Sequence, residues 1–212
     1  MNSPAPASSF DDVTVSKHRL ETLNDGVFAV VLTLLVIDLK LENLGHRPNE
    51  VEMWHELRHL MPQFFGYVVT FALTCGFWFQ HHALLHMLRH ATRSAYWLNA
   101  LFLFTVTLLP FSVSTFMKAP AYLPGALVYF GNLTLLPLAL AAGWRHAKSA
   151  GLLMAEANPE VVRRFTLQSR AFVLGGVAGL AMSFIEPAFA GLVYPLPILA
   201  FRIYQRRRAA HS

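Results

Sequence analysis

Five apolar stretches, most of them long enough to cross a bilayer as a helix, organise this 212-residue sequence. The hydrocarbon core of a bilayer is about 30 Å thick, and roughly 20 mostly apolar helical residues cross it. Charged residues make up only 14% of the chain, whereas a typical soluble domain carries about 25%. The sequence therefore predicts an all-α integral membrane protein. The five stretches are residues 61–84, 95–116, 121–144, 172–185 with their flanks, and 188–203.

A sixth span is predicted nearer the N-terminus, from about residue 20 to residue 41, and it is the least hydrophobic of the six. Only residues 26–37 within it are free of charge. Ionisable groups at or inside the membrane boundary usually face protein or water rather than lipid. This helix is therefore the candidate functional element. Its charged residues are Glu21, Asp25, Asp38 and Lys40.

Six spans place both termini on one side of the membrane, and the basic residues indicate which side that is. The opposite side would hold only Lys40, Arg47, Arg58 and Lys118, whereas all other Lys and Arg residues would lie on the side of the termini. Because cytoplasmic loops are enriched in Lys and Arg, we expect a multi-pass protein of the cell membrane with both termini cytoplasmic. The net charge of +5 then reflects membrane orientation and contact with lipids rather than nucleic-acid binding.

The predicted organisation has three parts. Residues 1–18 form a disordered cytoplasmic N-terminus, residues 19–205 form the six-helix transmembrane domain, and residues 206–212 form a basic cytoplasmic tail. In the fifth span, Gly175 and Gly179 form a Gly-x-x-x-Gly face that would let a neighbouring helix approach closely.

The first helix carries a stripe of branched aliphatic residues. Val30, Leu34 and Ile37 share one helical face, and Thr33 lies beside them. Several copies arranged around an axis would form stacked apolar rings beside a ring of hydroxyl groups. Such a pore gates by dewetting, and the hydroxyls replace part of the water around a passing cation. The same spacing also fits ordinary core contacts, and periodicity alone does not separate the two interpretations.

Three motifs in the first half of the chain resemble the lysosomal potassium channel family (transmembrane protein 175). Arg19 followed by Leu23-Asn24-Asp25 is similar to the first-helix signature of that family, Arg-x-x-x-Phe-Ser-Asp. The stretch Phe77-Trp78-Phe79-Gln80-His81-His82 is similar to the Trp-x-x-His stretch that ends its second helix. The segment from Asn99 to Leu109-Pro110-Phe111 is similar to its third helix.

The resemblance implies a single-repeat subunit of the bacterial type, with six transmembrane helices, that assembles as a homotetramer. Its first helix would line a central pore for potassium and other monovalent cations. Val30, Leu34 and Ile37 would form the hydrophobic constriction, and Thr33 would form the hydroxyl layer. Apart from the resemblance, the position of Asp38 near the outer end of this span places it at the outer mouth. The resemblance also implies a bracing polar network, formed by Arg19, Asn24, Asp25, Trp78 and His81.

The chain departs from the family pattern at three positions. Leu23 stands where the family has Phe, and Asn24 stands where it has Ser. Val30 is smaller than the usual Ile or Leu, so it would widen the constriction.

Acidic residues of the outer loop would concentrate cations near the mouth; they are Glu42, Glu50, Glu52 and Glu56.

Two alternatives come from other classes of protein. A small secondary transporter would need a polar pocket at the middle of the membrane, where this sequence offers mainly aliphatic residues and threonines. A membrane metalloprotease would use His55, Glu56 and His59, which match the zinc-binding His-Glu-x-x-His pattern. The protease would also need a third ligand on the same side of the membrane. The expected protein is not an enzyme, and no metal site or cofactor is predicted beyond permeating potassium ions.

Overall fold

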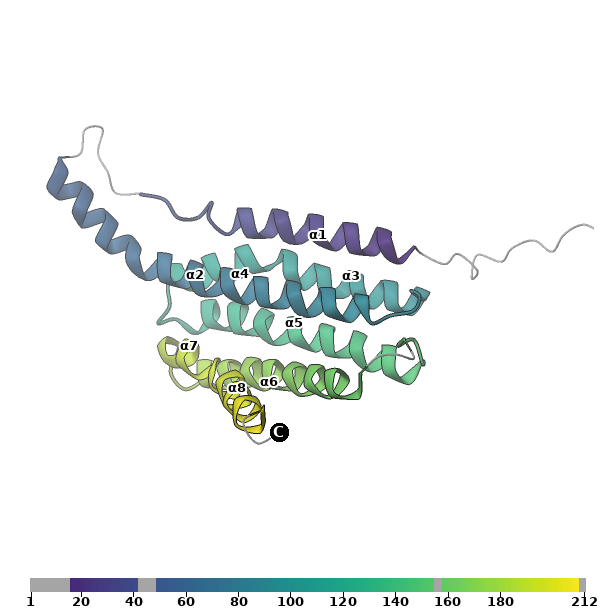
Figure 1. The fold of residues 1–212 in the computed structure, drawn as a ribbon. Coiled ribbons are helices and arrows are strands. Elements are labelled where there is room, and N and C mark those ends of the chain that lie inside the picture. Colours follow the sequence, from purple (N-terminus) through teal and green to yellow (C-terminus); the bar gives the residue numbers. More distant parts are fainter. Residues whose placement is uncertain (1–15, 42–48, 155–157, 210–212) are drawn as a thin grey trace, which may run out of the picture.

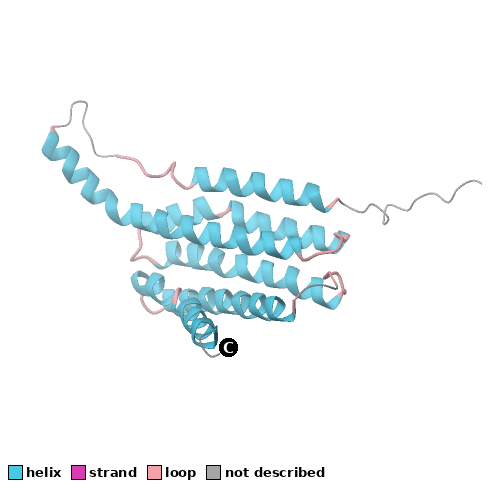
Figure 2. Cartoon of the chain, in the orientation of Figure 1, coloured by secondary structure: helices cyan, strands magenta, loops and turns pink. Residues whose placement is uncertain are grey.

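The computed structural model describes residues 16–41, 49–154 and 158–209, and these form a stack of helices (Figures 1 and 2). The N-terminal prediction for residues 1–18 lies mostly outside the described residues, as do Glu42, Arg47 and residues 210–212. The helices are α1 Lys17–Leu34, α2 Glu50–His86, α3 Arg93–Thr107, α4 Leu109–Lys118, α5 Leu123–Ser149, α6 Pro159–Ser183, η2 Pro187–Phe189, α7 Ala190–Val193 and α8 Leu196–Ala209.

Five helical segments are long and apolar enough to cross a membrane, which confirms the five predicted stretches. They are α2, the α3–α4 pair, α5, α6 and the segment Pro187–Arg208. The α3–α4 pair is interrupted at Leu108, two residues before Pro110. Proline lacks a backbone N–H group and is tolerated in the first turn of a helix, so its place at the start of α4 fits this break.

The first helix is shorter at its C-terminal end than the sequence predicts. It begins at Lys17 and ends at Leu34, and residues 35–38 continue as a turn. Here the hydrogen bonds tighten to an i→i−3 pattern, with Ile37 N donating to Leu34 O at 3.1 Å. Ile37 therefore lies just beyond α1, although it extends the line of Val30 and Leu34.

The two predicted terminal segments also contain helix. Lys17 and His18 belong to α1, so this helix begins before residue 19. Arg206, Arg207 and Arg208 form the last turn of α8 instead of a separate tail.

Helix α5 is the centre of the subunit. It packs against α3, α4 and α6, and 61% of its most apolar window is buried. Its buried side chains include Phe130, Leu133 and Leu136. Helix α1 lies at one edge of the stack, and α6, α7 and α8 lie at the other (Figure 1). Within the described chain, α1 contacts α2, α3 and α4.

Glycines let α6 approach its neighbours closely, as the Gly-x-x-x-Gly motif predicts. A Cβ atom on Gly176 would lie 2.7 Å from the Cα atom of Thr134 in α5. A Cβ atom on Gly179 would lie 2.8 Å from the ring of Phe130, and one on Gly175 would lie 2.5 Å from the carbonyl oxygen of Tyr194. Side chains at these positions would force the helices apart.

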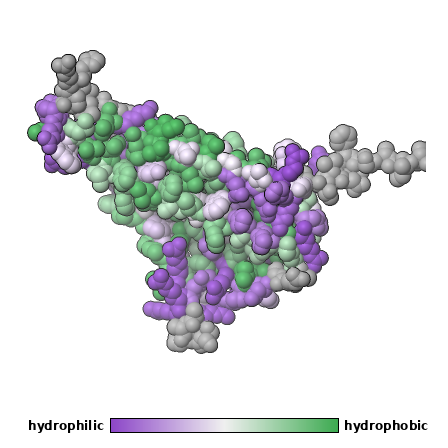
Figure 3. All heavy atoms as spheres, turned by 45° about the horizontal axis from the view of Figure 1, so that its top comes forward, coloured by the Kyte–Doolittle hydropathy of each residue, from purple (hydrophilic) through white to green (hydrophobic). Residues whose placement is uncertain are grey.

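Large hydrophobic side chains are exposed on α1, α2, α3, α5, α6 and α8. Figure 3 shows hydrophobic residues over most of the visible face, with hydrophilic residues at the tip of α2 and toward the opposite end. Only 17% of the apolar window of α2 is buried, and Phe65 and Phe79 are largely exposed. Soluble monomers rarely expose apolar patches of such extent. This surface fits lipid and further copies of the chain, as expected for a membrane protein.

Candidate functional site

Helix α1 has one face that packs into the subunit. Its buried residues recur every three or four positions, so they share that face, and the turn that follows α1 adds Leu35 to it. Phe28 is the most buried of them, with its ring centroid 6.0 Å from that of Phe102 in α3. The buried residues of α1 are Leu20, Asn24, Phe28 and Val31.

A second face of α1 is left uncovered by the subunit. The exposed fractions are 56% for Val30, 40% for Leu34 and 56% for Ile37, and Thr33 is also exposed. The same spacing of three or four residues continues toward the N-terminus. We call this face the outer stripe of α1; it comprises Arg19, Leu23, Gly26, Val30, Leu34 and Ile37, with Thr33 beside it.

The Thr33 hydroxyl is oriented by its own helix. It donates a hydrogen bond to the carbonyl oxygen of Val30 at 2.7 Å. A hydroxyl group has one hydrogen to donate and two lone pairs to accept with. With its hydrogen directed to the helix backbone, Thr33 keeps its oxygen lone pairs available to a ligand that needs oxygen atoms, such as a cation.

Two polar contacts hold α1 against α2. Trp78 Nε1 donates to Asp25 Oδ1 at 2.9 Å, so two residues of the predicted network meet across these helices. At the other contact, Lys17 Nζ donates to the carbonyl oxygens of His86 at 3.2 Å and Leu88 at 3.1 Å. A cation at the C-terminal end of a helix satisfies carbonyl groups that lack partners within the helix. Lys17 was not singled out from the sequence.

The other members of the predicted network do not join this pair. Arg19 is exposed, and no hydrogen bond or ion pair reaches its guanidinium group from residues 16–41, 49–154 or 158–209. Asn24 is buried, yet its side-chain nitrogen and oxygen have no hydrogen-bond partner among those residues. His81 is buried and stacks on Phe102, with ring centroids 4.5 Å apart. The bracing role of these residues stays a prediction.

A small polar spot lies inside the subunit beside His81. Of the residues described, His81 and Asn99 are the only polar ones that line a cavity of about 30 Å³ between α1, α2, α3 and α5. Gln80, the residue before His81, is buried with both side-chain polar atoms unpartnered in the described chain. Gln80 was not singled out from the sequence, although a polar residue within an apolar stretch is a signal that could have found it.

Asp38 lines an open cavity of about 280 Å³ at the end of α1 that faces α2 and α4. Gln63, Tyr67 and Ser114 supply further polar groups, and Lys118 lines the same cavity. One acidic residue at the start of α2 has a local structural role. Glu52 closes a capping box at the start of α2, where its carboxylate accepts from Asn49 N at 3.1 Å.

The zinc-protease pattern lies on an exposed part of α2. His55 and His59 are one turn apart, with ring centroids 4.5 Å apart, on the segment before Pro62 that leans away from the bundle (Figure 1). Among the residues that the structure describes, no group of three or more His, Cys, Asp or Glu is placed to hold a metal ion.

Comparison with known proteins finds a family and several relatives that this chain resembles. A family profile described as endosomal/lysosomal potassium channel TMEM175 matches residues 19–110. A potassium channel of Streptomyces collinus is 30% identical over 199 residues, which is 92% of this chain and 87% of that protein. A potassium channel of Chamaesiphon minutus is 29% identical over 173 residues, which is 79% of this chain and 84% of that protein.

A solved structure shares the fold. The crystal structure of a lysosomal potassium-selective channel TMEM175 homolog from Chamaesiphon minutus matches with a TM-score of 0.73 at 24% identity. The match covers 89% of this chain and 97% of that chain, so the likeness extends over nearly the whole subunit.

Proposed function

This chain belongs to the TMEM175 family of potassium channels, and we propose that four copies assemble around an axis with α1 lining the ion path. Membership of a channel family argues against the two alternative functions, the transporter and the metalloprotease. Conduction is passive and uses no cofactor. The observation that carries the pore proposal is the outer stripe of α1, which the subunit itself leaves uncovered.

The charges of α1 argue against contact with lipid. Its 18 residues include Lys17, Arg19, Glu21 and Asp25, and α1 is not among the five segments apolar enough to span a membrane. Ionisable residues in such helices face protein or a water-filled path, because exposure to hydrocarbon is costly. At the centre of an assembly, the buried face of α1 would pack against its own subunit. The outer stripe would face the neighbouring copies and the ions.

The outer stripe supplies a barrier and a ligand for cations. Rings of Leu34 and Ile37 would exclude water when narrow and so stop ion flow. A ring of Val30 would be somewhat wider, because valine is the smallest of the three side chains. Thr33, whose hydroxyl hydrogen is directed to Val30 O, would offer oxygen lone pairs to potassium beside this barrier.

Asp38 would lie at the outer mouth, in the open polar cavity formed with α2 and α4. Its carboxylate and the acidic first turn of α2 would raise the local concentration of cations. Lys118, which lines the same cavity, would limit this effect.

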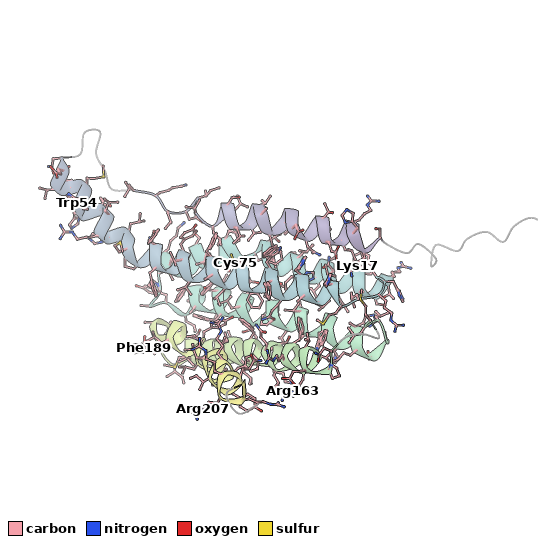
Figure 4. All side chains as sticks on the ribbon, viewed as in Figure 1. Lys17, Trp54, Cys75, Arg163, Phe189 and Arg207 are labelled. Carbon is pink, nitrogen blue, oxygen red and sulfur yellow. The ribbon has the colours of Figure 1, made fainter. Side chains whose placement is uncertain are left out.

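The chain is a multi-pass membrane protein, and its bacterial relatives favour the cell membrane. Lys17 and Arg163 lie toward the end of the bundle opposite Trp54 (Figure 4). The positive-inside rule then favours a cytoplasmic location for this basic end and for both termini.

The function is tested by reconstitution into planar bilayers with potassium on one side and sodium on the other. A potassium channel gives currents that reverse toward the equilibrium potential of potassium. Absence of current, or a current carried only by protons, would contradict the assignment of potassium as the permeating ion.

The barrier is tested by a polar substitution in the outer stripe. Leu34→Ser should raise the conductance severalfold, because a polar ring holds water where leucine expels it. Val36→Ser is the matched control, since Val36 is equally exposed but lies off the stripe. Equal effects of the two substitutions would contradict a barrier at Leu34.

A further inference from the structure

A groove lies between the C-terminal end of α5 and the first half of α6. Its volume is about 350 Å³, and its apolar wall includes Leu138, Ala141 and Ala142. Both helices are long and apolar enough to span a membrane, and Leu138 of the groove wall is exposed on the subunit surface. We call it the α5–α6 groove.

Three cations surround the α5–α6 groove. Arg145 and Lys148 come from the last turns of α5, and Arg170 comes from α6. All three are exposed, and no acidic side chain lines the groove among residues 16–41, 49–154 and 158–209. Lys148 Nζ lies 5.7 Å from the ring centroid of Trp144, which holds this cation over the groove wall. The positive charge is therefore not offset by a carboxylate of the groove.

One buried hydroxyl in the groove has no partner. Ser169 has an exposed fraction of 3%, and its Oγ atom makes no hydrogen bond with any residue of the described chain. Its neighbour Thr166 is fully engaged, accepting from Trp144 Nε1 at 2.9 Å and donating to Val162 O at 2.8 Å. Buried polar groups in native proteins usually have partners. Ser169 lines the groove, so rotation about its χ1 angle would let the unpaired hydroxyl donate to a ligand bound there.

We propose that the α5–α6 groove is a binding site for an anionic phospholipid. The phosphate would be held by Arg145, Lys148 and Arg170, and the Ser169 hydroxyl would donate to a phosphate or ester oxygen. An acyl chain would lie against the alanine and leucine wall. Basic pockets between transmembrane helices recognise anionic headgroups in this manner.

A second basic cavity shows why this groove is the better site. It lies between α6 and α8 and includes Arg163, Arg164 and Arg208. Glu160 lines the same cavity and pairs with Arg163 at 3.0 Å and Arg164 at 3.4 Å. Its charge is therefore partly neutralised by Glu160, whereas no carboxylate of the described residues pairs with the cations of the α5–α6 groove.

The site is tested by native mass spectrometry of the detergent-solubilised full chain titrated with palmitoyl-oleoyl-phosphatidylglycerol or with the matching phosphatidylcholine. The wild type should retain phosphatidylglycerol in preference. A variant with Arg145→Gln, Lys148→Gln and Arg170→Gln should bind phosphatidylglycerol about tenfold more weakly or worse. A control with Arg206→Gln and Arg207→Gln removes charge from the end of α8 and should keep the preference.

Two further variants keep the test decisive if the triple variant fails to fold. Ala142→Phe fills the groove and retains every charge, so it should also weaken phosphatidylglycerol binding. Ser169→Ala should weaken binding without lowering the unfolding temperature in lipid-free detergent, because Oγ has no protein partner to lose.

Three results would overturn the proposal. They are equal phosphatidylglycerol binding by wild type and the groove variants, equal loss in the α8 control, and displacement of the lipid by inorganic phosphate at the same concentration. The last result would identify an anion site that does not need a lipid. None of these measurements depends on ion conduction, so they stand apart from the pore proposal.

Discussion

The hydrogen bond between Trp78 and Asp25 is the polar side-chain contact that ties α1 to the middle of α2. Trp78→Phe keeps an aromatic ring and removes only the donor, leaving the Asp25 carboxylate without it. We expect a loss of about 1 kcal/mol in the free energy of unfolding, since this bond is partly exposed. Thermal unfolding in detergent measures the change.

Trp97→Phe is the control for this substitution. Trp97 is exposed on α3 and makes an edge contact with Tyr96, but no hydrogen bond of its indole is found in the described chain. The control should leave stability unchanged. If both tryptophan variants unfold like the wild type, the Asp25 contact contributes nothing to the attachment of α1.

At the scale of elements, the contact between α5 and α6 depends on glycine. Gly176→Ala would place a Cβ atom 2.7 Å from the Thr134 Cα atom, so the helices must separate. We expect a destabilisation of about 1–3 kcal/mol, the usual cost of overpacking. The unfolding transition in detergent, followed by circular dichroism, provides the measurement.

Gly131→Ala in α5 is the matched control, because a Cβ atom there would meet nothing within 4 Å. Alanine also favours a helix over glycine, so this variant should be as stable as the wild type or more stable. A Gly176→Ala protein as stable as the Gly131→Ala protein would show that the helices can repack at no cost.

The helices themselves were largely predictable from the sequence. Five apolar stretches predict five spans, because a helix needs only sufficient length and hydropathy to cross a bilayer. The end of α1 was not predictable, since no glycine or proline marks it and the chain passes into a turn at Leu35. Local tightening of hydrogen bonds leaves no clear mark in the sequence.

The candidate site was predictable in part. The 3.6-residue period separates the outer stripe from the buried face of α1, and the structure exposes Val30, Leu34 and Ile37 together. The partners of single polar groups were not predictable in the same way. The resemblance grouped Arg19 with Asp25, yet Arg19 lies on the outer stripe, while Asp25 points to Trp78. Such choices depend on rotamers and on neighbours from other helices.

At the scale of the whole molecule, the proposal requires assembly. Each chain has a mass of 23.7 kDa, and native mass spectrometry should find four chains per particle. Gly26→Phe should reduce the tetramer, because Gly26 lies on the outer stripe and a Cβ atom there would meet nothing within 4 Å in its own subunit. The bulky ring would instead collide with the neighbouring copies of α1.

Gly191→Phe is the control for assembly. Gly191 is exposed in α7, at the edge of the stack opposite α1, and a Cβ atom there also meets nothing within 4 Å (Figure 1). This variant should remain tetrameric. Dissociation of both variants, or of neither, would indicate that the copies do not meet along α1.

Chemical access to the outer stripe tests the pore most directly. In a Cys75→Ser background, Ile37→Cys would place a thiol in the ion path, and Val36→Cys would place one beside it but off the stripe. A cationic methanethiosulfonate reagent should reduce the potassium current of the Ile37→Cys channel and leave the Val36→Cys current unchanged. An unchanged Ile37→Cys current, with labelling of the thiol verified by mass, would contradict a pore lined by α1.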